Sequence, residues 1–454
     1  MNINFNKINE KLKFMPPAKI IFWGYICVIF IGAILLFLPI SSKGEYTSFS
    51  DAFFTSASAV CVTGLVRFDT YSHWSFFGQA VILLLIQTGG IGFMTAAVWF
   101  MTVSSRKIGI SQRVVMQNSI SAPQLGGIVK MTKFIILSTF TVEAIGAILL
   151  SFYFCRNNMG LPKGIWYGIF HSVSAFCNAG FDLMGYSGEY ISLTEYNGDL
   201  YINTVIMLLI ITGGLGFFVW KDILTNRFKF SKFRLHSKIV VSVSSILIIF
   251  GALFILLAEY KSGAYENLSF GRKILSSLFQ SVSARTAGFN TVDLTKYSES
   301  GIFLMICLML IGGSSGSTAG GIKTTTFAVI VLSIFASLRR KKECNIFGRR
   351  LESGIFAVVS SIFITYISLI CVCAVIISHI EKIPLLCAGF ECTSALATVG
   401  LSLSVTPSLG FISKMIIICL MIIGRVGSLT VIMAVMSPKE KPFSKFPLEK
   451  IQVG

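Results

Sequence analysis

Four short stretches of similar sequence, evenly spaced along the chain, decide how the rest of it is interpreted. Each of them ends an apolar segment in a glycine: Val62-Thr63-Gly64-Leu65, Asn178-Ala179-Gly180-Phe181, Thr286-Ala287-Gly288-Phe289 and Thr398-Val399-Gly400-Leu401. The glycines are 116, 108 and 112 residues apart, and a serine stands five or six residues before each one: Ser58, Ser174, Ser283 and Ser394. A fixed period of this kind indicates a repeated structural unit. The chain is therefore predicted to consist of four units.

A second glycine-rich marker follows each stretch, inside the next apolar run. Its four versions are Thr88-Gly89-Gly90-Ile91-Gly92, Thr212-Gly213-Gly214-Leu215-Gly216, Ile311-Gly312-Gly313-Ser314 and Ile423-Gly424-Arg425-Val426-Gly427. One copy would be a weak signal, but four copies in register with the hydropathy are specific. They give each unit the order span, short helix, glycine loop, span.

The composition identifies the environment of these units. Hydrophobic residues make up 54% of the chain and charged residues only 13%, which excludes a soluble enzyme, a disordered chain and a disulfide-rich secreted domain. Eight apolar runs reach the length of about 20 residues that crosses a bilayer: 20–40, 74–103, 134–155, 200–220, 239–258, 301–338, 353–380 and 413–436. Four runs are shorter and are candidates for re-entrant helices: 52–66, 164–181, 274–289 and 384–403.

The expected fold is an all-α polytopic membrane protein. Eight transmembrane helices and four re-entrant pore helices form four pseudo-symmetric span–pore helix–span repeats around one central pore. The repeats are expected at 1–103, 104–225, 226–338 and 339–436, with a C-terminal tail at 437–454.

Positive charge predicts the orientation. The chain carries 38 Lys and Arg against 20 Asp and Glu, and the excess gathers in five segments: 1–19, 104–133, 221–238, 337–352 and 437–454. By the positive-inside rule, both termini are expected in the cytoplasm. The same basic face can dock a cytoplasmic protein partner, whereas nucleic acid is not an expected partner.

The repeated unit predicts cation coordination by main-chain oxygens. A short helix that ends inside the membrane leaves its last carbonyls unpaired, with about half a negative charge at that end. Four such ends around one axis favour a cation, and loop carbonyls can replace its hydration shell. The alternative is four packing motifs in which glycine only lets helices approach. The candidate selectivity filter, with K⁺ as its bound ion, comprises Val62, Thr63, Gly64, Asn178, Ala179, Gly180, Thr286, Ala287, Gly288, Thr398, Val399 and Gly400.

The third repeat departs from the others. Its second span contains ten consecutive Gly, Ser, Thr or Ala residues, which cannot hold a stable helix. A phosphate-binding loop needs glycine before its lysine, but Ile322 precedes Lys323. We expect an unwound segment, 312–322, that acts as a flexible barrier in the ion path; a kink without a gating role is the alternative. The candidate gate comprises Gly312, Gly313, Ser314, Ser315, Gly316, Ser317, Thr318, Ala319, Gly320, Gly321, Lys323 and Arg425.

Charged residues in or near the spans are costly and call for partners. Arg425 replaces a small residue of the fourth marker, so it is expected to face the same axis as the unwound segment. Glu143 lies in mid-span, and Arg425, Lys323 and Arg285 are its candidate partners. The sequence does not decide among them, or between a gating role and a structural ion pair.

Four further polar residues carry structural expectations. Arg285 is expected to meet the negative end of the third pore helix. Asp51 is expected to cap the start of the first pore helix. Glu391 is a candidate for the outer mouth, and His171 is interpreted as a structural residue.

The four units with Gly64, Gly180, Gly288 and Gly400, the Gly/Ser/Thr-rich segment and Arg425 resemble the Trk/Ktr/HKT superfamily of potassium transporters. The bacterial Ktr membrane subunit is the nearest type, and the resemblance covers essentially the whole chain. It implies K⁺ uptake, often influenced by Na⁺, across a bacterial cell membrane, with no organic cofactor on this chain. It also implies a homodimer with one pore per subunit and a cytoplasmic ring of nucleotide-binding regulatory subunits. None of the four strands is the Thr-Val-Gly-Tyr-Gly of a potassium channel, so looser selectivity is expected.

Two other classes of function remain for comparison. An obligatorily Na⁺- or H⁺-coupled secondary transporter also builds ion sites from broken helices, but from an inverted pair of repeats. A membrane-embedded enzyme would need a catalytic motif, and the sequence has no HExxH and no GxSxG with a partner histidine. No enzymatic activity is therefore expected.

Overall fold

The computed structural model describes residues 15–44, 46–92, 94–95, 109–120, 124, 126–340, 345–351, 354–428 and 430–431. The predicted tail at 437–454 lies outside these residues. The regular secondary structure of the described part is helical apart from the short hairpin of β1 (Asn345–Ile346) and β2 (Arg349–Arg350). This agrees with the predicted all-α class.

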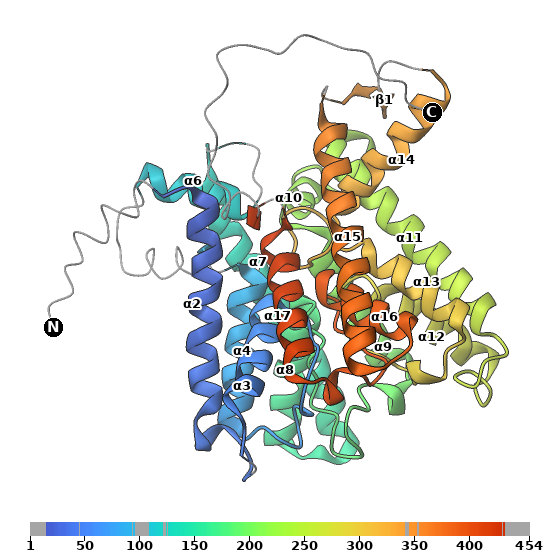
Figure 1. Cartoon of the computed structure of the whole chain (residues 1–454). Helices are drawn as coiled ribbons and strands as arrows, with labels where there is room; N and C mark the ends of the chain where they lie inside the picture. Colours follow the sequence, from blue (N-terminus) through green and yellow to red (C-terminus); the bar gives the residue numbers. More distant parts are fainter. Residues whose placement is uncertain are drawn as a thin grey trace, which may run out of the picture.

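Each repeat contributes a long first helix, a short second helix and a further helix after the glycine loop (Figure 1). In the first repeat these are α2 (Pro17–Phe37), α3 (Phe49–Cys61) and α4 (Phe76–Ile91). In the second they are α7 (Ile128–Phe154), α8 (Leu161–Cys177) and α9 (Leu200–Leu215), with α6 (Ile110–Ser119) before them and α10 (Phe217–Thr225) after them. The third contains α11 (Leu235–Glu259), α12 (Phe270–Ser283), α13 (Glu299–Leu310) and α14 (Thr324–Leu338). The fourth contains α15 (Ile355–Glu381), α16 (Leu385–Leu396) and α17 (Phe411–Val426).

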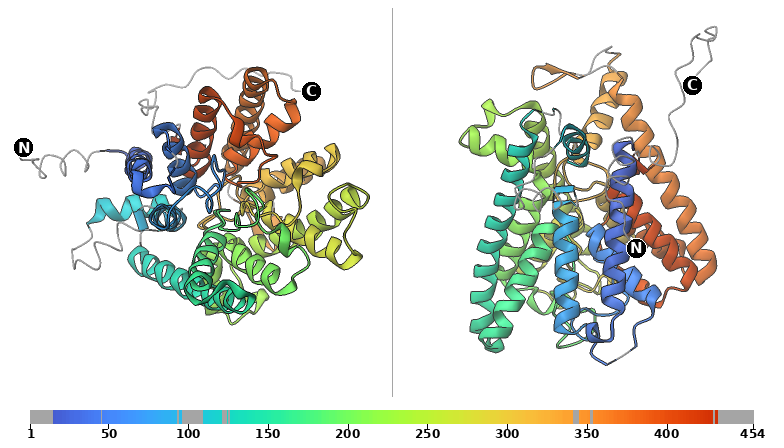
Figure 2. Two further views of the ribbon diagram at one scale, coloured as in Figure 1. Left: turned by 90° about the horizontal axis from the view of Figure 1, so that it is seen from below. Right: turned by 90° about the vertical axis from the view of Figure 1, so that its left-hand side faces the viewer.

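The repeats form a closed ring. Within each repeat the first helix packs on the short helix, as α2 does on α3 and α7 on α8. Between repeats, the helix after the glycine loop packs on the short helix of the next repeat: α4 on α8, α9 on α12, α13 on α16, and α17 back on α3. Seen from below, the four repeats follow one another around a centre in chain order (Figure 2). The predicted pseudo-symmetric arrangement therefore positions the four glycine loops around one axis.

Within the described ranges, four helices are long and apolar enough to cross a membrane: α2, the helix from Ile128 to Asn157, α11 and α15. The bent pair α9 and α10, which meet at 95°, gives up to five. A break in the second span is predicted for the third repeat alone. The structure also interrupts the second span of the first, second and fourth repeats, at Gly92, Gly216 and Gly427. These last glycines of each marker have φ of 87°, 92° and 95°, a conformation that ends a right-handed helix.

The outer surface of the ring is apolar. Large hydrophobic side chains are exposed along the first helices of all four repeats: Trp23, Ile31, Leu137, Ile148, Ile249, Leu257, Ile364 and Val372. Water-soluble monomers rarely expose continuous apolar patches on this scale. The short helices are buried instead, and in α3 every residue from Phe54 to Cys61 is inaccessible or nearly so. This distribution is that of a multi-pass membrane protein with its polar machinery inside.

Local contacts explain where the first short helix begins. Ser48 caps α3, because its hydroxyl accepts a hydrogen bond from Asp51 N at 3.2 Å. The expectation that Asp51 is the cap is therefore wrong. The Asp51 carboxylate instead pairs with Lys414 on α17 at 2.7 Å and lies 3.6 Å from Arg67 Nε. This ion pair closes the ring between the fourth and first repeats.

Candidate functional site

The four glycine loops (62–64, 178–180, 286–288 and 398–400) meet in a closed ring. A Cβ added to Gly180 would lie 2.8 Å from the carbonyl oxygen of Ala287, and one on Gly288 would lie 2.6 Å from that of Val399. A Cβ on Gly64 would collide with the Ala179 carbonyl, and one on Gly400 with the Thr63 carbonyl. Each glycine thus lies against the carbonyl group of the next loop, and the fourth loop returns to the first. The structure brings all twelve predicted loop residues together.

The backbone of these loops is strained at a position that sequence reasoning missed. Val62, Asn178, Thr286 and Thr398 have φ of 56°, 60°, 77° and 52°, and the glycine two residues later is also positive in every loop. Three of these four residues are β-branched, for which positive φ is rare and costs about 1–3 kcal/mol. Strain of this kind persists only where the surroundings enforce it. A regular recurrence at the ends of four short helices indicates a shared functional geometry.

The repeated serines hold the strained loops in place. Ser58 and Ser394 accept hydrogen bonds from the amides of Gly64 and Gly400, at 3.1 and 3.0 Å. The hydroxyls of Ser174 and Ser283 donate to the carbonyl oxygens of Phe181 and Phe289. Each serine therefore ties the last turn of a short helix to the end of its glycine loop, which explains why serine recurs five or six residues before the glycine.

Polar side-chain oxygens remain unpaired within the loops. Across the described residues, four buried oxygens here have no hydrogen-bond partner: Thr63 Oγ1, Asn178 Oδ1, Thr286 Oγ1 and Thr398 Oγ1. A buried polar atom without a partner costs about 1–3 kcal/mol. Thr398 Oγ1 lies against Gly320 of the 312–322 segment, so at least one of these oxygens faces the segment rather than the other loops.

The first glycine of the second marker serves close packing. A Cβ on Gly89, Gly213 or Gly424 would collide with a carbonyl oxygen in the last turn of a short helix, and those carbonyls belong to Val60, Phe176 and Leu396. Gly312 breaks this pattern, because its neighbour is the carbonyl of Gly320 within the same segment. The third repeat thus replaces a helix contact by a folded loop.

The intramembrane segment (312–322) is a hydrogen-bonded loop. Gly312 N donates to Ile322 O at 2.9 Å, and Ile322 N to Leu310 O at 3.3 Å, so the two ends of the segment lie side by side. Ser314 N donates to Gly214 O at 3.0 Å, which attaches the segment to the second repeat. The predicted unwound segment is therefore present.

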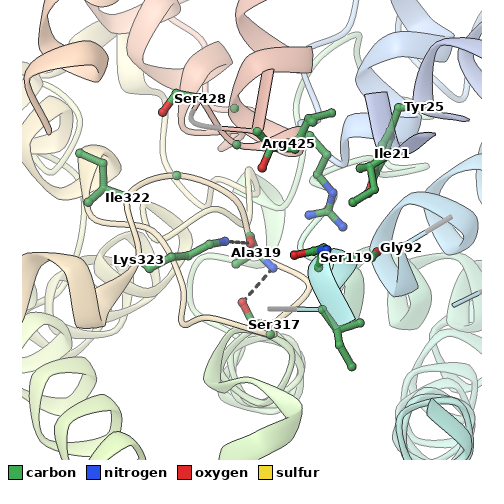
Figure 3. A pocket seen from close by; sticks show the side chains of 18 of the residues that line it. Ile21, Tyr25, Gly92, Ser119, Ser317, Ala319, Ile322, Lys323, Arg425 and Ser428 are labelled. Atoms are coloured by element: carbon green, nitrogen blue, oxygen red, sulfur yellow. Dashed lines mark hydrogen bonds between the residues drawn. The ribbon is translucent and has the colours of Figure 1, made fainter. Parts of the chain in front are cut away.

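Two cationic side chains form hydrogen bonds to the segment. Lys323 Nζ donates to Ala319 O at 2.8 Å. Arg425 donates to Thr318 O in the segment, and to the carbonyls of Gly89 and Gly90 at the end of α4. Both side chains point toward the turn of the segment (Figure 3). Arg425 thus bridges the first and third repeats and contacts the 312–322 segment.

Two cavities, named outer and inner for reference, lie on either side of the glycine loops and the segment. The outer cavity, of about 120 Å³, is lined by all four loop glycines together with acidic and polar loop residues. The inner cavity, of about 270 Å³, is lined by segment residues together with Lys323 and Arg425, but by none of the loop glycines. The glycine loops and the segment therefore separate two spaces along one axis.

The outer cavity carries negative charge. Asp69 and Asp182 both line it. Burial, with the nearby Asp69 carboxylate as the next contribution, raises the pKa of Asp182 to about 7. Asp69 itself accepts hydrogen bonds from the amides of Tyr71, Ser72 and Tyr190, at 2.9, 2.8 and 3.2 Å.

The mid-span acid has partners that the sequence did not suggest. In the described part of the chain, Glu143 Oε2 accepts from Gln87 Nε2 at 2.9 Å and Oε1 lies 3.6 Å from Cys177 Sγ, so Arg425, Lys323 and Arg285 are not its partners. Arg285 donates to Ser244 Oγ at 3.1 Å and Gly312 O at 3.3 Å, which places it against the segment rather than on the end of α12.

Two other residues hold the outer loops. Glu391 is fully buried and accepts from Ser402 Oγ, Leu403 N and Thr406 Oγ1, at 2.6, 2.9 and 2.6 Å. The suggestion that it lies at the outer mouth is therefore wrong. His171 Nε2 accepts from Leu183 N at 3.2 Å. Both residues stand three positions before the repeated serine, and this shared register was the signal that sequence reasoning missed.

The ring of glycine loops, the segment beneath it and the apolar outer surface define a helical membrane transporter. A family model described as a cation transport protein, TrkH, matches residues 3–445. The chain is 38% identical, over the full length of both chains, to the potassium/sodium uptake protein NtpJ of Enterococcus hirae. It is 39% identical to the Ktr system potassium uptake protein B of Bacillus subtilis, over 95% of each chain. The solved potassium transporter TrkH from Vibrio parahaemolyticus shares the fold, with a TM-score of 0.73 at 19% identity, over 93% of this chain and 86% of that one.

The chain therefore belongs to the TrkH family of cation transport proteins. Within the Trk/Ktr superfamily it is similar to the Ktr membrane subunits, as the sequence motifs indicated.

Proposed function

We propose that this chain is the ion-translocating membrane subunit of a bacterial potassium uptake system. The closed ring of four glycine loops above the intramembrane segment carries this proposal. The twelve loop residues carry no charged side chain, and a site formed by their carbonyls at four helix ends would suit a dehydrated monovalent cation. The relatives named for potassium uptake support K⁺ as the transported ion.

In this proposal the twelve glycine-loop residues form the selectivity filter. The intramembrane segment, with Lys323 and Arg425, forms the gate. The positive charges of Lys323 and Arg425, on the inner-cavity side of the filter, would repel an ion that leaves the filter. The hydrogen bonds of Arg425 would hold the segment across the path. Movement of the segment would open the path into the inner cavity.

The assembly and the orientation are part of the proposal. The basic residues of β2, Arg349 and Arg350, are exposed, and they lie at the same end of the molecule as α10 (Figure 1). We place this end, and both termini, in the cytoplasm of a bacterial cell. A homodimer with one pore per subunit would dock a ring of nucleotide-binding regulatory subunits on this basic face. The Ktr system names of the relatives fit such a multi-subunit arrangement.

Glycine-to-serine changes test the filter. Serine at position 64, 180, 288 or 400 adds a Cβ that meets the next loop, so each variant should alter the preference for K⁺ over Na⁺. The effect should be stronger at Gly64 and Gly400, where the next carbonyl is nearer than at Gly180 and Gly288. The measurement is K⁺ uptake with Na⁺ as competitor, in cells that depend on this transporter.

Gly160→Ser is the matched control. Gly160 has φ of 76°, similar to the loop glycines, but open space around its Cβ position. It should therefore reproduce the backbone strain without disturbing the ring. Wild-type selectivity in all four loop variants would contradict the filter.

The same uptake assay distinguishes a gated pore from a transporter whose K⁺ uptake is obligatorily coupled to Na⁺ or H⁺. A gated pore passes K⁺ down the membrane potential, at about 2.3 kcal/mol per charge per 100 mV. Uptake should then continue when Na⁺ is removed and the pH gradient is collapsed. Uptake that stops under either condition, at every potential, would favour a Na⁺- or H⁺-coupled secondary transporter.

A further inference from the structure

Thr318 is the point at which the intramembrane segment contacts a glycine loop. Its hydroxyl donates to the carbonyl of Phe176 at 3.0 Å and accepts from Asn178 Nδ2 at 3.1 Å. Its amide donates to Gly213 O at 3.3 Å, and its carbonyl accepts from Arg425. Thr318 is fully buried. One residue of the proposed gate therefore touches the second short helix, the second glycine loop and Arg425.

The bond from Asn178 fixes the orientation of its side-chain amide. Because Nδ2 points to Thr318, Oδ1 lies on the other side of the amide, where it is buried and has no partner within the described residues. Asn178 is 1% exposed and has φ of 60°. It directly precedes Ala179, whose carbonyl lies against Gly64. A movement of the Asn178 side chain would therefore change the position of its unpaired Oδ1 and of the adjacent Ala179 carbonyl in the ring.

The contact is specific to the second repeat. The equivalent positions are held by Val62, Thr286 and Thr398. Valine has no polar group, and the hydroxyls of both threonines have no partner among the described residues. Of the four equivalent positions, all of which the structure describes, Asn178 is the one whose side chain forms a hydrogen bond to the segment.

We propose that Asn178 is a specificity-determining residue and that Thr318 is the positioning residue that orients it. Displacement of the segment breaks the Asn178–Thr318 bond, frees the amide and changes which cation the second loop prefers. The ion preference of the pore therefore depends on the state of the gate. This inference rests on the proposed function, because it requires a filter above a movable segment.

A pair of variants at Thr318 tests the inference. Thr318→Val keeps the shape of the side chain but removes the hydroxyl, whereas Thr318→Ser keeps the hydroxyl. Thr318→Val removes the hydrogen bonds to both Phe176 O and Asn178 Nδ2. In proteoliposomes the full-length variant should show a K⁺/Na⁺ selectivity about tenfold below wild type, as loss of the Asn178 bond alone permits. Thr318→Ser should restore the wild-type ratio. In Thr318→Val the KM for K⁺ should change more than the maximal rate. The reason is that the variant alters ion binding in the filter and leaves the amount of protein unchanged.

Asn178→Thr provides the second test. It gives the second loop the residue found in the third and fourth, and it needs no change in the segment. It should lower selectivity to the same extent as Thr318→Val, and the double variant should be no worse than either. If Thr318→Val does not fold, Asn178→Thr alone decides the question.

The outcomes separate the inference from the function beneath it. Wild-type K⁺/Na⁺ ratios in folded Asn178→Thr and Thr318→Val, together with raised uptake in Arg425→Met, would overturn the coupling and leave the gate intact. Wild-type uptake in Arg425→Met and wild-type selectivity in the loop-glycine variants would overturn the proposed function itself.

Discussion

Replacing Arg425 with methionine should open the proposed gate. Methionine is unbranched, like the aliphatic part of arginine, and carries no charge. The guanidinium donates to three carbonyls, of Thr318, Gly89 and Gly90, and a hydrogen bond from a charged group contributes about 1.5–3 kcal/mol. The contributions of these hydrogen bonds are not additive. We therefore take the equivalent of one strong bond, about 3 kcal/mol, as the loss in the free-energy difference that favours the closed over the open position of the segment. A shift of that size changes the ratio of closed to open states on the order of 100-fold.

The assay is the initial rate of K⁺ uptake by cells that express the chain without a regulatory partner. The rate should rise in Arg425→Met, because both the bridge and the positive charge in the path are removed. Arg425→Lys keeps the charge but not the forked set of donors, so its uptake rate should lie between those of wild type and Arg425→Met. An unchanged or lower rate in Arg425→Met, at equal amounts of protein in the membrane, would refute the gating role.

Two further predictions concern the outer half of the molecule. Lys414→Met removes the ion-pair partner of the buried Asp51 and should lower thermal stability in detergent by an amount that corresponds to about 3 kcal/mol; the double variant with Asp51→Asn should recover most of it, and a single variant as stable as wild type would contradict the pair. Asp182, whose pKa is raised to about 7, is charged above that pH and neutral below it. The KM for K⁺ should therefore rise, by up to about tenfold, between about pH 8 and about pH 6, since a negative mouth concentrates cations. Asp182→Asn should show the higher KM throughout, and a variant that keeps the wild-type pH profile would exclude this carboxylate.

The repeat pattern predicted the all-α membrane class and four glycine loops in one ring, whereas the predicted count of eight transmembrane and four pore helices is not confirmed. Gly64, Gly180, Gly288 and Gly400 recur with the hydropathy, and a pattern that repeats four times can hardly be satisfied except by an arrangement around one axis. The breaks at Gly92 and its equivalents were also readable, because the last glycine of the marker recurs. Hydropathy alone does not show these breaks, because the apolar runs continue through them.

Side-chain partners could not be predicted in the same way. Glu143 contacts Gln87 and Cys177, which lie 56 and 34 residues away, and hydropathy does not show which faces of α4, α7 and α8 meet. Asn178 and Thr318 are 140 residues apart. Their contact depends on the path of an irregular segment, for which neither period nor propensity provides a register.

A structure of the protein determined with Rb⁺ in place of K⁺ would test the proposed filter directly. Anomalous scattering should locate an ion on the axis between the four loops, ringed by main-chain oxygens from every repeat. An ion held by carboxylates elsewhere, or four loops turned away from a common centre, would contradict it.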